Sequence, residues 1–153
     1  MKTLGDLETR REIAARMGNL RADSPARWGC MNAHQAICHL NDSFKAVLGK
    51  KPVSEATGFV QQTLLKWAAL WLPLEWPRGF RTRPEIDQQT GGTPPLDFDR
   101  DLEELRTLAA RFTEAALARA GIMRHPVFGA MTAREWLRWG YLHVDHHLRQ
   151  FGA

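Results

Sequence analysis

The sequence contains few cysteines and no long apolar run. Cys30 and Cys38 are the only cysteines among 153 residues, too few and too close together for a disulfide framework. No stretch approaches the ~20 apolar residues that a membrane span requires, and no signal-like apolar region stands at the N-terminus. We therefore expect a cytoplasmic protein with no membrane partner.

Motifs of several enzyme and binding classes are missing as well. The sequence has no Ser-His-Asp order, no glycine-rich phosphate loop, no His-Glu-x-x-His motif and no acidic residue that stands out as a general base. The net charge is +4, but arginines are spread along the chain among acidic residues. Because neither a recognition helix nor an aromatic RNA-binding pattern accompanies this charge, nucleic acid is not expected as a partner.

The composition that remains indicates one globular domain spanning residues 1–153. Hydrophobic residues make up 44% of the chain and charged residues 25%, which suffices for an apolar core. No strand-like alternation is evident, and helical patterns cover about 6–20, 32–48, 55–72, 99–121 and the region from 132 onward. This order predicts an all-α fold, a four-helix bundle with an additional short helix.

Capping residues mark the starts of three of these helices. Asn32 with Gln35, and Thr132 with Glu135, form capping-box patterns, and Asp6 is the predicted N-cap of the first helix. The inward face of that first helix is predicted to carry Leu7, Ala14 and Met17.

A long segment between Leu74 and Leu96 is rich in proline and glycine and predicts a loop. Loops of this length are unusual in a compact domain and often carry function. Two interpretations have equal weight: a functional loop or lid, and a surface connection that crosses the bundle.

The C-terminal run HVDHHLRQFG carries the most informative pattern. His143 and His147 lie four residues apart on a predicted helix, so their imidazoles share one face, one turn apart. His146 can also pair with His143 by spacing. Turning the helix at 100° per residue places His147 on the interior side and His146 opposite it, which selects His143 and His147.

His39 is the predicted third member of this group. It lies on the shoulder of the apolar stripe of its helix, whereas His34 is turned about 140° away and shares the outer face with Cys38, interpreted as an inert thiol. In an antiparallel helix pair, a rise of ~1.5 Å per residue brings His39 to the level of His143. Three imidazoles then make a divalent-metal site with open positions. The alternative is a set of partly buried histidines bonded to backbone or acidic groups.

Three neighbouring residues receive simpler interpretations. Asp42 is assigned to the surface because its face is polar, and Gln150 points closer to solvent than to the histidines. Gly140 is expected to leave space beside the metal ligands.

Three stretches, WGCMNAHQAICHLNDS, HPVFGAMTAREW and HVDHHLRQFG, resemble the DinB/YfiT-like metalloenzyme superfamily over most of the chain. The resemblance implies a helical bundle of that type, in which one histidine of the second helix and a His-x-x-x-His pair of the last helix bind a divalent metal. On this sequence those ligands fall on His39, His143 and His147, and His146 matches no ligand position. The identity of the metal stays open among Zn, Ni, Fe and Mn.

Such a site indicates metal-dependent chemistry on a small molecule. Three neutral imidazoles leave the ion its full charge and an exchangeable position, so a bound water or thiol becomes acidic. The resemblance implies thiol-dependent transfer with a low-molecular-weight thiol in some members and hydrolysis in others. If the chain is an enzyme, we therefore expect a metal-dependent transferase or hydrolase.

The alternative function is a non-catalytic helical module that binds a ligand or partner through the Trp-rich third segment. Most tryptophans at helical spacing belong to a core. A ligand pocket or a homodimer face are the other interpretations of Trp67, Trp71, Trp76, Trp136 and Trp139.

Overall fold

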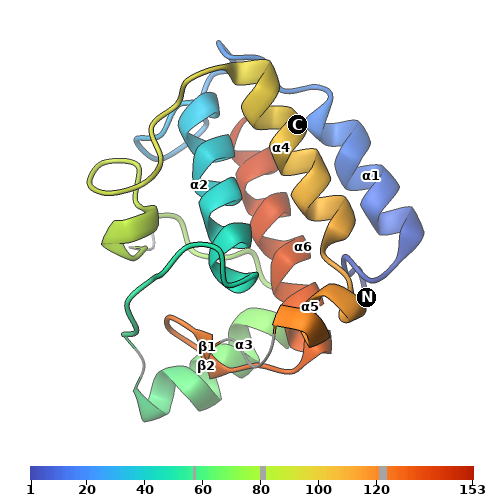
Figure 1. The fold of residues 1–153 in the computed structure, drawn as a ribbon, viewed down its shortest axis with the longest axis vertical. Helices are drawn as coiled ribbons and strands as arrows, with labels where there is room; N and C mark the ends of the chain where they lie inside the picture. The colour runs from blue at the N-terminus through green and yellow to red at the C-terminus, as the bar shows by residue number, and fades with distance from the viewer. Residues whose placement is uncertain (57, 80–81, 121–123) are drawn as a thin grey trace.

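The computed structural model describes residues 1–56, 58–79, 82–120 and 124–153. Within these ranges the chain is mostly helical, which confirms the predicted all-α class (Figure 1). No helix in the described ranges is long and apolar enough to cross a membrane. The helices are α1 (Leu7–Met17), α2 (Ala33–Val47), α3 (Lys66–Trp71), α4 (Phe98–Arg111), α5 (Glu114–Ala120) and α6 (Ala133–Gln150), with a π-helical turn η1 (Gln61–Leu65) before α3 and a 3-10 turn η2 (Pro84–Ile86) in the long loop.

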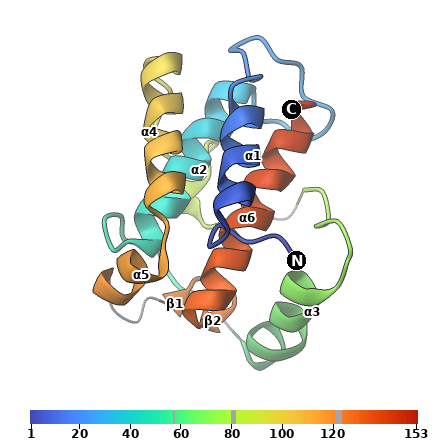
Figure 2. The same ribbon diagram turned by 90° about the vertical axis from the view of Figure 1, so that its right-hand side faces the viewer.

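The four longest helices lie side by side (Figures 1 and 2). α2 packs against α4 and α6, and α1 packs against the same two helices. α1 and α6 run in one direction and α2 and α4 in the other, so α2 and α6 are antiparallel as expected. At the centre of the core, the rings of Phe44 and Phe112 meet edge to face with centroids 4.9 Å apart, and both residues are buried.

The two predicted capping boxes, at the starts of α2 and α6, are confirmed. Oδ1 of Asn32 accepts a hydrogen bond from the backbone of Gln35, whose side chain accepts one from the backbone of Asn32, and Thr132 and Glu135 repeat this exchange. Both pairs satisfy backbone donors that a helix start leaves without partners. Asp6 precedes α1 as predicted, but its side chain makes no capping hydrogen bond.

The predicted inward face of α1 is wrong at two positions. Met17 is buried, whereas Leu7 is 54% exposed and Ala14 is exposed as well. The buried residues of α1 are Thr9, Ile13 and Met17. α1 packs mainly against α4 and α6, so its buried stripe is narrow, and Leu7 and Ala14 lie beside it, on a groove open to solvent.

The predicted fourth helix is two helices. α4 ends at Arg111, and α5 begins at Glu114 after a break at Phe112, whose backbone leaves the helical region with φ −76° and ψ 82°. Oγ1 of Thr113 accepts from the backbone N–H of Ala116 at 3.3 Å, so Thr113 caps α5. A threonine followed by an acidic residue was the local signal for this new helix start.

A short hairpin precedes α6 where no strand was predicted. β1 (Arg124–His125) and β2 (Gly129–Ala130) pair antiparallel, with Arg124 opposite Ala130. Gly129 adopts φ +68°, which favours glycine. Strands of two residues carry no detectable alternation, so sequence periodicity could not reveal them.

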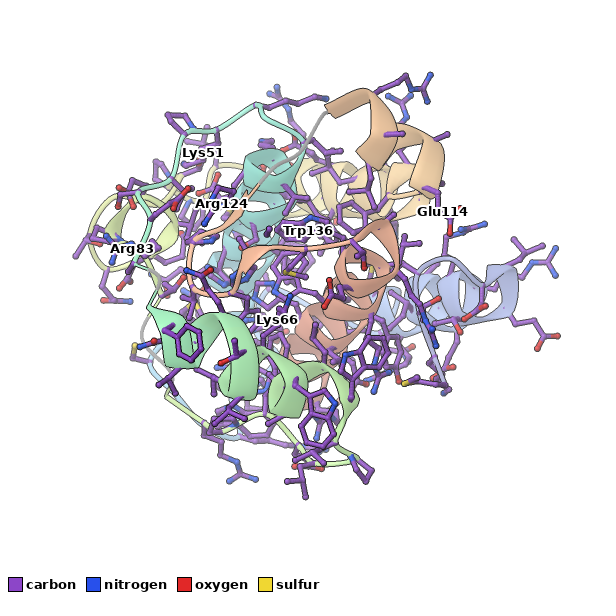
Figure 3. The ribbon with its side chains drawn as sticks, turned by 90° about the horizontal axis from the view of Figure 1, so that it is seen from below. Lys51, Lys66, Arg83, Glu114, Arg124 and Trp136 are labelled. Atoms are coloured by element: carbon purple, nitrogen blue, oxygen red, sulfur yellow. The ribbon has the colours of Figure 1, made fainter. Side chains whose placement is uncertain are left out.

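The helical segment 59–71, which contains η1 and α3, begins four residues later than predicted and keeps one apolar side exposed (Figure 3). Lys66 holds the segment to the rest of the molecule: its Nζ donates to the backbone oxygen of Ala130 and pairs with Glu135, both at 3.1 Å. We call the exposed side the apolar face; its residues are Phe59, Val60, Leu64, Leu65 and Trp67.

The tryptophans divide between core and surface. Trp136 and Trp139 of α6 are buried, in agreement with the core interpretation. Trp71 and Trp76 are partly buried and pack against the core. Trp67 is 57% exposed and belongs to the apolar face.

Candidate metal centre

His39 of α2 and His143 and His147 of α6 form one cluster, as the sequence predicted. The centroid of the His39 ring lies 5.1 Å from the centroid of each of the other two rings. The centroids of the His143 and His147 rings are 5.2 Å apart. Each residue offers one ring nitrogen, and these three nitrogens all lie within 4.8 Å of one another. His39 and His147 are buried, and His143 is partly exposed. His143 is therefore the least buried of the three residues.

Hydrogen bonds fix which nitrogen carries the hydrogen in two of these rings. Nδ1 of His39 lies 2.7 Å from the backbone oxygen of Ile86, which can only accept, so Nδ1 donates and Nε2 holds a lone pair. Nδ1 of His147 lies 2.8 Å from Oε1 of Gln150, whose Nε2 donates to the backbone oxygen of Trp28 at 2.7 Å. Reversing the amide would set two oxygens against each other. Both rings therefore keep Nε2 as an acceptor.

All three rings are neutral at neutral pH. Burial lowers the pKa of His143 and of His147 well below 6.5, and the neighbouring histidines lower it further. Burial also lowers the pKa of His39, although its hydrogen bond to Ile86 opposes this effect. Neutral imidazole is the form that binds metal ions, so the cluster needs no proton release before it takes up an ion.

The spacing of the nitrogens suits a metal ion. Nε2 of His39 and Nε2 of His143 are 3.1 Å apart. Two nitrogens at the usual Zn–N distance and a tetrahedral angle are about 3.3 Å apart, so a small adjustment would suffice. The donor set is nitrogen only, which suits Zn²⁺, Ni²⁺ or Fe²⁺ better than Mn²⁺, an ion that prefers oxygen ligands.

The loop between Leu74 and Leu96 contributes directly to this centre. Besides Ile86, it supplies Trp76, whose ring centroid lies 5.9 Å from that of His143. Thr93 donates from its backbone N and its Oγ1 to the carboxylate of Asp42, at 2.7 and 2.6 Å. These contacts favour a functional loop over a simple connection, while movement as a lid stays a prediction.

Two side chains assigned to the solvent are buried. Asp42 is 0% exposed and, besides Thr93, pairs with Nζ of Lys51 at 2.9 Å. Gln150 is 2% exposed and orients His147. The three-residue step from His147 to Gln150 was a usable signal, because such residues are neighbours on a helix. Asp42 carried no local signal, since Thr93 is far away in the sequence.

Gly140 does not leave free space beside the histidines. A Cβ atom at this position would come within 2.9 Å of Cδ1 of Leu4 and 3.0 Å of Cε1 of Phe112. Glycine is therefore required by close packing against the core and not by room for a ligand.

His146 stays outside the cluster but is not on an open polar face. Its ring lies 5.7 Å from that of Trp28 and 6.3 Å from that of Trp76. Burial first, and the charge of Arg149 second, lower its pKa. The connection between α1 and α2, which contains Trp28, and the long loop, which contains Trp76, therefore cover this side of α6. The helix pattern alone could not predict this cover.

A second group of potential metal ligands lies between α2 and α4. Nε2 of His34 is 2.7 Å from Oδ2 of Asp101, and Sγ of Cys38 donates to the same oxygen at 3.5 Å. The outer face of α2 is thus covered by α4, and Cys38 is only 3% exposed. Burial, followed by the charge of Asp101, raises the pKa of Cys38 to about 12, so its thiol is protonated at neutral pH.

Comparison with protein families gives one result. A family described as "Protein of unknown function (DUF1569)" matches residues 5–153. The resemblance to the DinB/YfiT-like superfamily is therefore wrong, because DUF1569 is a distinct family and nothing links the two. A His-x-x-x-His pair with one distant histidine can arise in any helical protein in which two of three histidine ligands share a helix, so this motif does not identify a family. No curated protein and no solved structure matched the chain.

Proposed function

The chain belongs to the DUF1569 family, and we propose from its own geometry that it binds a divalent metal ion through His39, His143 and His147. The observation that carries the proposal is the convergence of three neutral imidazoles from two antiparallel helices. Two of these rings are oriented from behind by Ile86 and Gln150, as metal-binding histidines usually are. Without an ion, His143 would donate a hydrogen from Nε2 to Nε2 of His39, and a bound ion would take the place of this hydrogen.

We further propose that the metal serves an enzyme acting on a small molecule. With three neutral ligands, the ion would keep its charge and an exchangeable position, at which a water or a low-molecular-weight thiol becomes nucleophilic. The partial exposure of His143 provides the side from which a substrate would enter, and the rings of Trp76 and Trp139 flank it, with centroids at 5.9 and 4.9 Å. These rings would limit water to the reacting position. The thiol rests on this chemistry alone, because the resemblance that suggested it is wrong.

Metal analysis tests the proposal directly. The protein is purified without a nickel column, stripped with a chelator, and loaded separately with Zn²⁺, Ni²⁺, Fe²⁺ and Mn²⁺. We expect binding to the cluster, with Mn²⁺ the weakest. Substituting His39→Ala, His143→Ala or His147→Ala should each remove this binding. A wild-type protein that takes up none of the four ions would refute it.

His146→Ala is the matched control. It removes the neighbouring histidine on the same helix, and the metal affinity should stay close to that of the wild type. Catalysis is tested next, by adding thiols and ester or amide substrates to Co²⁺-loaded protein and following its visible spectrum. A change in the spectrum with thiols supports transfer chemistry, and turnover of substrate by loaded protein alone supports hydrolysis.

The proposal includes the architecture. We infer that α1, α2, α4 and α6 form a four-helix bundle and that residues 1–153 form one domain. In support, each of these helices packs against two others, and the backbone bonds from Leu4 to Leu137 and from Arg27 to Gln150 tie the N-terminal segment to both ends of α6. Near- and far-ultraviolet circular dichroism should then report one unfolding transition with the same midpoint. Two separate midpoints would contradict a single domain.

A second candidate function is association with another copy of this chain through the apolar face. Phe59 and Leu64 are 83% and 70% exposed, and several large apolar side chains exposed on one short helical segment are typical of an interaction surface. Lys66 within the segment is paired with Glu135, so its charge is compensated. A two-fold dimer would bury the same apolar face on both copies.

Sedimentation velocity tests this association. The wild type should dimerise at micromolar concentrations, and Leu64→Lys should make it monomeric. Leu74→Lys, at a residue 68% exposed outside the apolar face, is the matched control and should leave the dimer intact. Trp67→Ala is a sharper probe than Trp71→Ala, because Trp71 is half-buried beside Arg134. A monomeric wild type would exclude this role.

A further inference from the structure

The group between α2 and α4 has the composition of a metal site. We infer that His34, Cys38 and Asp101 form a second divalent-metal site, independent of the three-histidine cluster. Their three ligand atoms all lie within 4.8 Å of one another. His34 and Cys38 are four residues apart on α2, and Asp101 lies in the first turn of α4. The arrangement repeats that of the cluster: two residues one turn apart on one helix and a third residue from a helix packed against it.

The distances fit a tetrahedral ion. A thiolate and a carboxylate oxygen bound to Zn²⁺ at their usual lengths are about 3.5 Å apart. Sγ of Cys38 and Oδ2 of Asp101 are 3.5 Å apart. A nitrogen and an oxygen ligand would be about 3.3 Å apart, so the 2.7 Å contact between His34 and Asp101 must open slightly. A rotation of the surface-facing Asp101 side chain can provide this.

The site also has a route of entry and a further oxygen donor. The side chains of His34 and Asp101 are 16% and 18% exposed, whereas Cys38 is buried beneath them. Asn41, three residues beyond Cys38, donates from Nδ2 to the backbone oxygen of Asp101. Its Oδ1 is buried and has no hydrogen-bond partner among the residues that the structure describes. The fourth ligand is then water or this oxygen.

The chemistry balances with one proton released. On metal binding the S–H bond of Cys38 breaks, a bond from sulfur to the metal forms, and the proton leaves to solvent without any change of oxidation state. The thiolate and the Asp101 carboxylate together neutralise a divalent ion, and His34 binds as a neutral ring. A sulfur, nitrogen and oxygen set of this kind suits Zn²⁺, and such an ion would clamp α2 to α4.

Cobalt spectroscopy tests the site, because thiolate bound to Co²⁺ gives an intense near-ultraviolet charge-transfer band that imidazole ligands do not. The reduced, metal-free, full-length protein is titrated with Co²⁺ without oxygen. We expect about two equivalents to bind and the band to develop. Cys38→Ser should lose the band and one equivalent. His143→Ala should lose one equivalent and keep the band, so failure of the second site and failure of the proposed function are distinguishable.

The second cysteine provides the matched control. Cys30 is exposed, and Cys30→Ser should keep the band. A wild type without the band, a band that survives in Cys38→Ser, or a band lost in Cys30→Ser would each overturn the second site. If Cys38→Ser does not fold, His34→Ala serves as the second variant. It should weaken the band-forming site at least about tenfold, and unchanged affinity would overturn the assignment.

Discussion

Nε2 of His39 and Nε2 of His143 lie 3.1 Å apart across the interface of α2 and α6. Because Ile86 holds the hydrogen of His39 on Nδ1, the facing nitrogen of His39 is an acceptor. His143 must then donate a hydrogen to it, or a cation must lie between the two lone pairs. This contact is therefore sensitive both to protonation and to metal.

Gln150→Leu should weaken metal binding without removing a ligand. Gln150 accepts from Nδ1 of His147 and donates to the backbone of Trp28, so leucine leaves both groups without their partner. We expect the metal affinity to fall about 10–100-fold, measured by competition with a chromophoric chelator. Gln89→Leu, at an exposed position, should bind like the wild type. Equal affinities in the two variants would show that Gln150 does not orient the ligand.

Acid should destabilise the metal-free protein. Burial holds the pKa of His39, His143 and His147 below 6.5, so below this pH the unfolded chain binds more protons than the folded chain. Stability is therefore greatest above about pH 7 and decreases as the pH falls toward the folded-state pKa values, by up to about 1.4 kcal/mol per pH unit for each histidine. Urea unfolding of the metal-free protein at a series of pH values below about 7 measures this loss of stability. A free energy of unfolding that does not change with pH would contradict the neutral, buried state of the three histidines.

His125 should contribute a separable part of this acid sensitivity. Its Nδ1 accepts from the backbone N–H groups of Val127 and Phe128, and burial lowers its pKa to about 3. His125→Asn keeps an oxygen acceptor that does not titrate. The loss of stability between about pH 6.5 and 5 should then shrink by about 1–2 kcal/mol, as measured by urea unfolding. If the stability of His125→Asn depends on pH as that of the wild type does, groups other than His125 cause the acid sensitivity.

Local patterns predicted much of the fold. The starts of α2 and α6 were predictable because a capping box involves residues three apart, such as Asn32 with Gln35. The faces of His39, His143 and His147 followed from helix periodicity in the same way. The break before α5 was missed although Thr113 marks it, because the apolar spacing continues across the break through Phe112.

What depends on distant segments was not predictable. The carbonyl of Ile86 and the side chain of Trp76 come from a loop without periodicity, so nothing in the sequence placed them on the histidines. The helix pattern assigned Gln150 to solvent, but the connection between α1 and α2, which contains Trp28, covers it. Helix patterns describe one helix at a time, and these contacts arise where loops cover it.

Asp42→Ala should destabilise the fold through the long loop. Asp42 is fully buried and holds Thr93 and Lys51, so alanine leaves their donors without an acceptor. Because Lys51 is partly exposed, we expect a loss of about 2–4 kcal/mol in the free energy of unfolding, measured with urea. Asp23→Ala, an exposed carboxylate, should change stability by less than about 0.5 kcal/mol. A similar small effect at Asp42 would contradict its role in anchoring the loop.

Gly140→Ala should destabilise the protein although alanine favours helices. The helix preference contributes about 1 kcal/mol in favour of alanine. The new Cβ, however, would approach Leu4 to 2.9 Å and Phe112 to 3.0 Å, and both side chains are fully buried, so neither can move away. Overpacking of this kind costs about 1–3 kcal/mol, and thermal unfolding should show a net loss. Gly18→Ala is the control: the three atoms nearest its Cβ would be the carbonyl oxygens of Ala15 at 3.1 Å and Ala14 at 3.9 Å and the flexible Arg106 at 3.7 Å, so its effect should be much smaller. Gly140 lies one turn before His143, so a shift of the backbone at this position would also lower the metal affinity. A Gly140→Ala variant that is more stable than the wild type and binds metal equally well would show that α6 is not tightly packed against Leu4 and Phe112.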